Sequence, residues 1–456
     1  MFGAELAGQL LGRGLALCVC AEVGCVHELA CPCGAEIPAG GIGLLLDQPH
    51  PGVAEAIQDS LGQTAAMTVY LAGASRTGIG AFCGVFEQTP APALGSVVVK
   101  AALQRAGVPG DRVDEVIFGN VIGAGLGQNV ARQVTIGAGL SPAVGATTVN
   151  KVCGSGLKAV MLAAQAVQCG DAGVVVAGGT ENMSRAPYLL EKARVGYRMG
   201  NGELVDSMIR DGLWDAYRNV HMGLCGDRCG EKYGFTRDQQ DDFAVTSFKR
   251  AIQASASGHF AAEIAPVEAK AGRDAVVVKE DENLKKFNEE KLRKLRPAFG
   301  ENGRVTAGNA SSINDGAAAL VVLSQDKLAE LRVKPQAKIL GYATFSREPE
   351  WFTLAPIGAI SKLLKRLGLT VGDVGLFEIN EAFSVVPLAA MQDLGIPHEK
   401  CNVHGGAVAL GHPIGDSGAR TLVTLVHAMN QRGVKLGIDA LCIGGGEAVA
   451  MAVELC

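Results

Sequence analysis

Short runs of strand-like character alternate with helical runs along most of the chain. From residue 68 onward, the β-branched apolar runs have the length of strands, and the helical runs between them commonly end at a glycine. The pattern predicts strands over 68–72, 113–119, 173–177, 320–323, 337–344, 376–379, 440–443 and 447–454. It predicts helices over 94–106, 157–168, 237–255, 358–367, 385–394 and 418–431. Such alternation is typical of a parallel sheet with helices on its faces, so we expect an α/β fold.

The alternation is interrupted once, and its order occurs twice. Residues 183–300 are more charged and more varied than the rest, and we expect them to form a loop subdomain that covers a substrate. Before and after this insertion, the order of strand, loop, helix and glycine-ended strand is the same. The sequence predicts an N-terminal half over 67–330, which includes the insertion, and a C-terminal half over 331–456. Two such halves packed face to face would bring their loops to one cleft.

Residues 1–66 lack this pattern and do not match the rest of the chain. They carry scattered prolines and glycines without a sustained hydrophobic period, so we expect a disordered extension. A zinc site is the alternative, although the C-x-C spacing departs from the usual finger pattern. Its ligands would be Cys18, Cys20, His27, Cys31 and Cys33.

Composition and charge narrow the class of protein. Hydrophobic residues make up 48% of the sequence and 61 residues are glycine, which suits buried strands and closely packed helices. A net charge of −5 without a basic tract argues against a nucleic-acid partner. We find no run of about 18 apolar residues and therefore expect no transmembrane helix. The 13 cysteines are irregularly spaced, which indicates reduced thiols and a cytoplasmic protein.

The chain turns sharply around Cys153. Residues 147–149 have the character of a strand end, Gly154 and Gly156 permit a tight turn, and the helix over 157–168 follows. Cys153 is then at or just before a helix N-terminus, where free N–H groups and the helix dipole favour a thiolate. A thiolate is a nucleophile, so Cys153 is a candidate covalent catalyst. The segment fits a small apolar cysteine in a buried turn equally well.

Three other positions could complete a catalytic site. His412 lies in a glycine-rich loop before a helix, the place in the second half that Cys153 has in the first. This position in the repeat favours a general base over a structural histidine. Cys442 ends a strand before glycines 444–446, whose bare N–H groups can form an oxyanion hole; otherwise it is a core thiol. Asn380 ends a strand, and its amide can hold a water or a carbonyl oxygen.

Four motifs together resemble those of the thiolase family and occur in the family's order. They are Val–Cys–Gly–Ser–Gly–Leu–Lys around Cys153, Asn380–Glu–Ala–Phe, Gly411–His–Pro–Ile–Gly, and Cys442–Ile–Gly–Gly–Gly. The resemblance runs from about residue 68 to the C-terminus. It implies duplicated βαβαβαββ halves in a five-layered α-β-α-β-α arrangement. The first motif, with His221–Met–Gly, is similar to the branch of the family that forms acetoacetyl-CoA.

The resemblance also implies a mechanism. Cys153 would attack acetyl-CoA, and His412 would take the thiol proton. Cys442 would remove a proton from a second acetyl-CoA, whose enolate attacks the acyl group to give acetoacetyl-CoA and CoA. Asn380, through a water, and His412 would stabilise the enolate, while the N–H groups of Cys153 and Gly444 would stabilise the oxyanion. No cofactor or metal is implied, because coenzyme A is substrate and product.

The same resemblance implies an assembly and a set of binding residues, and it shows where this sequence departs from the family pattern. It implies a homo-oligomer, a dimer or a tetramer. Phe352 replaces a methionine in the acyl pocket, which could alter the choice of chain length. Further departures are Cys225, Cys229, Ser312 and His404. The family's contacts to coenzyme A carry over to His221, Met222, Phe299, Ala307, Ser311 and Phe383.

Three other functions remain open at this stage. A degradative 3-ketoacyl-CoA thiolase of broader chain length is the nearest alternative. A non-catalytic acyl-CoA or lipid-binding protein of the same shape is another, although such proteins can lose a motif cysteine or histidine, and Cys153, His412 and Cys442 are all present. A ketoacyl synthase is disfavoured, because that relative has histidine or asparagine in place of Cys442.

Overall fold

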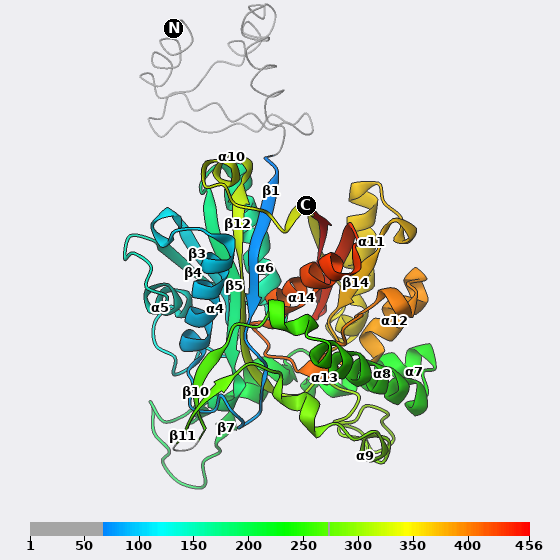
Figure 1. The fold of residues 1–456 in the computed structure, drawn as a ribbon. Helices are drawn as coiled ribbons and strands as arrows, with labels where there is room; N and C mark the ends of the chain where they lie inside the picture. Colours follow the sequence, from blue (N-terminus) through cyan, green and yellow to red (C-terminus); the bar gives the residue numbers. More distant parts are fainter. Residues whose placement is uncertain (1–66, 272–273) are drawn as a thin grey trace, which may run out of the picture. The chain divides into compact units, whose positions relative to one another are not determined.

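The computed structural model describes residues 67–271 and 274–456, so the predictions of a disordered extension or a zinc site over 1–66 lie outside the described residues. Within them, ten strands form one sheet in the order β14-β15-β16-β13-β1-β12-β5-β3-β4, with β2 beside β12 (Figure 1). Their bounds are β1 (Val69–Arg76), β2 (Gly80–Ala81), β3 (Glu115–Gly119), β4 (Gly145–Val149), β5 (Val174–Asn182), β12 (Asn314–Ser324), β13 (Ala337–Ser346), β14 (Leu376–Ile379), β15 (Leu436–Ile443) and β16 (Glu447–Leu455).

The predicted parallel sheet is right for only part of this sheet. β3 pairs in parallel with β4 and β5, and β14 pairs in parallel with β15. The other pairs, such as β5–β12 and β15–β16, are antiparallel. A parallel pair needs a crossover of a dozen or more residues, whereas only the three glycines 444–446 join β15 to β16. The prediction failed because it treated every strand as the end of a strand–helix–strand unit.

The helices form three layers around the two halves of the sheet, as the resemblance implied (Figure 1). α6 and α14 pack against each other between the halves; α4 and α5 cover one outer face, and α11 and α12 cover the other. Three separate apolar cores fill the spaces between these layers. The expected five-layered α-β-α-β-α arrangement is thereby confirmed. The bounds are α4 (Ala91–Ala106), α5 (Val130–Gly137), α6 (Ser155–Cys169), α10 (Gln325–Glu330), α11 (Ala355–Leu367), α12 (Val385–Leu394), α13 (Ala407–Leu410) and α14 (Ser417–Arg432).

Among the described helices, one apolar segment is long enough to cross a membrane, and it contains the central helix α6. Val152–Cys169 passes that test by length and composition, but most of it is buried inside the fold. A second difference from prediction concerns β5, which continues to Asn182, whereas the strand was predicted to end at residue 177. β12 pairs with β5 along this whole extension, and the pairing keeps it a strand.

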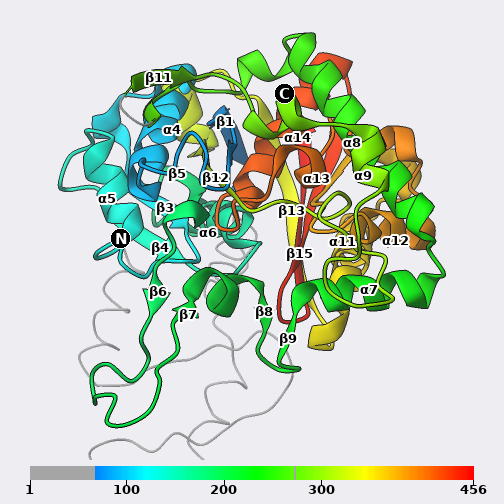
Figure 2. The same ribbon diagram turned by 90° about the horizontal axis from the view of Figure 1, so that it is seen from below.

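The insertion between the halves carries small sheets and helices and lies along one end of the layers (Figure 2). A buried ion network connects it to β1, because Arg76 donates to Glu263 at 2.6 Å and to Asp281 at 2.7 and 3.0 Å. Its elements are β6 (Tyr188–Leu189), β7 (Val205–Asp206), β8 (Trp214–Asp215), β9 (Val220–His221), α7 (Met222–Tyr233), α8 (Arg237–Ala256), β10 (Val267–Ala271), β11 (Asp274–Val278) and α9 (Glu289–Arg293). Short 3₁₀ turns cover Gly110–Arg112, Met183–Arg185, His259–Ala262, Glu282–Lys286, Pro349–Leu354, Val371–Asp373 and His398–Lys400, and a π-helical turn covers Met208–Leu213.

Candidate active site

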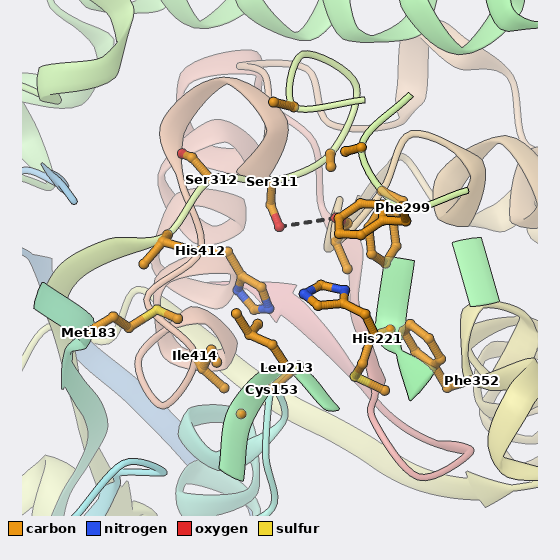
Figure 3. Close-up of a pocket in the computed structure, with 18 residues that line it drawn as sticks. Cys153, Met183, Leu213, His221, Phe299, Ser311, Ser312, Phe352, His412 and Ile414 are labelled. Carbon is orange, nitrogen blue, oxygen red and sulfur yellow. Dashed lines mark hydrogen bonds between the residues drawn. The ribbon is translucent and has the colours of Figure 1, made fainter. Parts of the chain in front are cut away.

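A cavity of about 300 Å³ lies where both halves and the insertion meet (Figure 3). Two of the predicted catalytic residues, Cys153 and His412, line it. All the predicted coenzyme A contacts line it as well: His221, Met222, Phe299, Ala307, Ser311 and Phe383. The structure therefore brings together loops that are far apart in sequence, as the repeat predicted. Cys442, Asn380 and Gly444 are not part of the lining.

The turn that carries Cys153 is strained and held by a local hydrogen-bond network. Val152 has φ of +45°, a left-handed conformation that is costly for a β-branched residue. The hydroxyl of Ser155 donates to the carbonyl of Val152 at 2.6 Å and accepts from the N–H of Lys151 at 2.8 Å. The side chain of Asn150 accepts from the N–H of Val152 at 3.0 Å. These contacts hold Cys153 just before the first turn of α6, where it lines the cavity.

The ionisation state of Cys153 differs from the prediction. Burial raises the pKa of its thiol to about 11, although hydrogen bonds from the N–H groups of Gly444 and of Cys153 itself lower it. The expectation that the helix N-terminus favours a resting thiolate is therefore wrong, because desolvation outweighs the local dipoles. The same two N–H groups are those expected in the oxyanion hole, and both are directed at the sulfur.

His412 has the hydrogen bonds of a general base. Its Nδ1 lies 2.5 Å from Oγ of Ser417, which in turn donates to the carbonyl of Pro413 at 2.8 Å. Because the hydroxyl has one proton, Nδ1–H is the donor to Ser417, and Nε2 carries the lone pair. Nε2 is buried and has no partner among the described residues. Burial, and then the charge of Arg420, lower the pKa of His412 to about 3, so the ring is neutral.

Glu181 fixes the His412 loop to the first half, and sequence reasoning missed it. Its carboxylate accepts from the N–H groups of Val121 at 2.9 Å and Ile122 at 3.2 Å, and from that of Gly415 at 3.0 Å. It is fully buried at the end of β5, with its pKa raised to about 7 by burial. A carboxyl at the end of a long apolar run was the only signal in the sequence. One side chain thus holds backbone from both halves.

Cys442 and Asn380 lie behind the lining of the cavity. Burial, and then the neighbouring thiol of Cys153, raise the pKa of Cys442 well above its usual range, so the two sulfurs are close enough to interact. Asn380 is buried, and neither atom of its amide has a partner among the described residues. A buried amide without partners suits the predicted role of holding a water, since buried polar groups are normally hydrogen-bonded.

Aromatic rings form part of the cavity wall. His221 stacks on Phe299 with ring centroids 4.4 Å apart, and its Nδ1 accepts from the N–H of Gly223 at 3.1 Å, which leaves Nε2–H as a donor. Figure 3 shows the rings of His221 and His412 facing each other across the cavity. Ser311 donates to the carbonyl of Ala382 at 3.0 Å. The wall therefore combines aromatic surface with one imidazole N–H.

Several apolar lining residues were missed as binding residues by sequence reasoning, and only Ile414, in the Gly411–His–Pro–Ile–Gly motif, had a signal in the sequence. They are Met183, Leu213, Ile313 and Ile414. The two cysteines that depart from the family pattern, Cys225 and Cys229, are buried in α7. They do not disturb the start of this helix, because His221 caps it and the helix begins at Met222.

Comparisons with known proteins agree with this geometry. The thiolase N-terminal domain family matches residues 69–326 and the thiolase C-terminal domain family matches residues 333–455. Acetyl-CoA acetyltransferase 2 of Arabidopsis thaliana is 53% identical over 85% of this chain and 97% of its own length. Acetyl-CoA acetyltransferase of Cupriavidus necator is 51% identical over 85% of this chain and 99% of its own.

Solved structures show the same fold. A thiolase of Ascaris suum in complex with coenzyme A has a TM-score of 0.81 and 44% identity, and covers 85% of this chain and 100% of its own. The acetyl-CoA acetyltransferase of Bacillus anthracis has a TM-score of 0.84 and 39% identity, and covers 86% of this chain and 100% of its own. With two domain families, high identity and the fold in agreement, the chain belongs to the thiolase family.

Proposed function

We propose that this protein condenses two molecules of acetyl-CoA to acetoacetyl-CoA and CoA, reversibly, through an acyl-enzyme on Cys153. The observation that carries the proposal is a buried thiol and an unpartnered imidazole nitrogen, Nε2 of His412, on one cavity, with two N–H groups directed at the sulfur. The names of the similar enzymes from Arabidopsis thaliana and Cupriavidus necator support the same substrate. We propose that no cofactor is needed, because coenzyme A is both substrate and product.

The first half-reaction transfers the acetyl group to the enzyme. Nε2 of His412 takes the thiol proton as the sulfur of Cys153 attacks the thioester carbonyl. The oxyanion accepts hydrogen bonds from the N–H groups of Cys153 and Gly444, each worth about 3 kcal/mol in comparable sites. The bond from carbon to the sulfur of CoA then breaks, and the CoA thiolate takes the proton of Cys442. The acyl-enzyme is left with a Cys442 thiolate and a His412 imidazolium.

The second half-reaction forms the carbon–carbon bond. The Cys442 thiolate removes a proton from the methyl group of a second acetyl-CoA, and the His412 imidazolium and a water on Asn380 stabilise the enolate oxygen. The enolate attacks the acyl carbonyl, and the Cys153 thiolate leaves and takes its proton back from His412. Each group has then returned to its starting state, so the sequence is balanced and can also run in reverse.

Mass spectrometry after mixing with acetyl-CoA tests this mechanism. Wild-type protein should gain one acetyl group on Cys153, and Cys153→Ala should gain none. Cys442→Ala should still be acetylated but should form no acetoacetyl-CoA. Acetylation that persists in Cys153→Ala would contradict the assignment of the nucleophile.

A degradative 3-ketoacyl-CoA thiolase of broader chain length is the second candidate. Its support is the apolar lining of the cavity, which an acyl chain could occupy. Against it, the rings of Phe352 and Phe383, whose centroids are 6.4 Å apart, both line the cavity and reduce the space left for an acyl chain. Comparing acetoacetyl-CoA with a long-chain 3-ketoacyl-CoA separates the candidates, because a preference for the longer substrate would overturn our choice.

We further propose a cytoplasmic homo-oligomer, a dimer or a tetramer. β4 supports an assembly, because it ends the sheet, pairs only with β3 among the described strands, and has no fully buried residue. A relative from Gibberella zeae, 49% identical, is named as cytosolic. Light scattering on the purified protein tests the assembly, and a monomer would contradict it.

A further inference from the structure

We propose that the ion pair between Lys151 and Glu447 positions the two N–H groups that serve Cys153, and that both are positioning residues for the reaction. The inference rests on the proposed function. The Nζ of Lys151 lies 2.7 Å from Oε2 of Glu447. Lys151 stands two residues before Cys153, and Glu447 three residues after Gly444. The pair therefore links the loops that supply the two N–H groups, one from each half of the fold.

On the side of Cys153, Lys151 is built into the turn. Its N–H donates to the hydroxyl of Ser155 at 2.8 Å, and its carbonyl accepts from the N–H of Gly154 at 3.1 Å. The strained Val152 lies between Lys151 and Cys153. A displacement of Lys151 would therefore be passed on to the N–H of Cys153.

On the side of Gly444, Glu447 anchors a loop that has no side chains of its own. β15 and β16 are joined by glycines 444–446, and Glu447 is the first residue after them, paired with Ile443 across the hairpin. Its Oε1 also accepts from the hydroxyl of Ser346 at 3.2 Å. Because the glycines offer no side chain to pack or bind, Glu447 supplies the polar anchor of this loop.

The two loops touch, so a small movement of one alters the other. A Cβ on Gly154 would overlap Cδ1 of Ile443, which shows how closely the turn approaches the end of β15. The N–H of Gly444 is already directed at the sulfur of Cys153. The relative position of the loops thus decides whether both N–H groups can reach one oxyanion.

The pair is suited to positioning rather than to stabilising the fold or the thiolate. The side chains of Lys151 and Glu447 are 20% and 36% exposed, and ion pairs in that setting add little to stability. Glu447 also neutralises the ammonium, while burial and the two N–H groups set the pKa of the thiol. Loss of the pair should therefore slow acyl transfer without unfolding the protein, and any displacement of the N–H groups from the sulfur should raise the pKa of the thiol, because these groups lower it.

Three variants test the inference on the full chain: Lys151→Met, Glu447→Gln and the exchange Lys151→Glu with Glu447→Lys. Lys327→Met is the matched control, because it removes another ion pair, at 2.6 Å from Glu330 and 36% and 45% exposed, on the surface helix α10. The readouts are the rate of Cys153 acetylation by acetyl-CoA, KM, the melting temperature, and the pH profile of Cys153 alkylation by iodoacetamide.

Removing an oxyanion donor outright costs about 100- to 1,000-fold in rate, so loosening one should cost about tenfold. We expect each single variant to lose about tenfold in acetylation rate, with KM and melting temperature unchanged and with no shift of the alkylation profile to lower pH. We expect the exchange to regain most of the rate. Single variants within about twofold of wild type, an alkylation profile shifted to lower pH, or an exchange no faster than the single variants would each overturn the inference. Wild-type protein that is never acetylated would instead contradict the proposed function.

Discussion

We predict that Cys153 remains a thiol at neutral pH. It should become a thiolate only at a higher pH than most cysteine nucleophiles require. Burial raises the pKa of Cys153 to about 11 and lowers that of His412 to about 3. At pH 7 the thiolate then makes up about one part in 10,000 of the resting enzyme. We therefore expect both groups to be neutral before substrate arrives, with no ion pair between them.

The size of the two pKa shifts argues against a resting ion pair of Cys153 and His412. The two pKa values differ by about 8, so moving the proton from Cys153 to His412 costs about 11 kcal/mol before the ions attract each other. The attraction between unit charges about 4 Å apart is about 4 kcal/mol at an effective dielectric constant of about 20. The attraction does not offset the cost, so the proton moves only as the sulfur attacks a carbonyl whose charge the N–H groups stabilise.

The rate of Cys153 alkylation by iodoacetamide reports the thiolate directly. Between about pH 7 and about pH 10 the rate constant should rise about tenfold for each pH unit, because the thiolate fraction does so. His412→Asn should retain this slope while it abolishes acetylation by acetyl-CoA, and Cys153→Ser is the control for modification elsewhere. A rate constant that is flat from about pH 6 to about pH 9 would show a resting thiolate and refute the reasoning.

Three further substitutions test separate parts of the site. Phe352→Leu should shift kcat/KM about tenfold toward a longer 3-ketoacyl-CoA, because the buried ring lines the cavity; an unchanged ratio of the two substrates would contradict this. Ser417→Ala should lower kcat about 10- to 100-fold with little change in KM, because the tautomer of His412 is no longer fixed, and Ser417→Thr should restore it. Glu181→Gln places an NH₂ group against backbone N–H donors and should reduce the free energy of unfolding by about 1–3 kcal/mol, measured by urea titration.

The sequence was a good guide wherever local signals decide the structure. β14 and α12 have the predicted bounds, Leu376–Ile379 and Val385–Leu394, because glycine or asparagine follows each apolar run at once. Strand direction was not predictable in this way. β12 returns from a long insertion and β16 from a three-residue hairpin, so both are antiparallel to their neighbours although their own sequences resemble those of buried parallel strands.

In the site, too, residues marked by their local sequence were predicted, whereas residues whose role depends on distant partners were not. Cys153 and His412 were found because glycines mark the loops that carry them, and both line the cavity. Glu181 and Ser417 were missed, because their roles depend on backbone groups and a ring that lie elsewhere in the sequence or across a turn. The thiolate prediction failed for a related reason. The helix dipole can be read from the local sequence, whereas desolvation depends on the whole packed structure.

Close contact between the two central helices explains why the halves meet at their reactive loops. Gly156, in the first turn of α6, lies so near α14 that a Cβ there would be 2.6 Å from the backbone nitrogen of Ala419. Gly418, in the first turn of α14, likewise would overlap the backbone of Leu157. Each helix thus packs its N-terminal turn against that of the other, and only glycine permits so close an approach. Because Cys153 and His412 lie just before these turns, the contact that joins the halves also sets the distance between nucleophile and base.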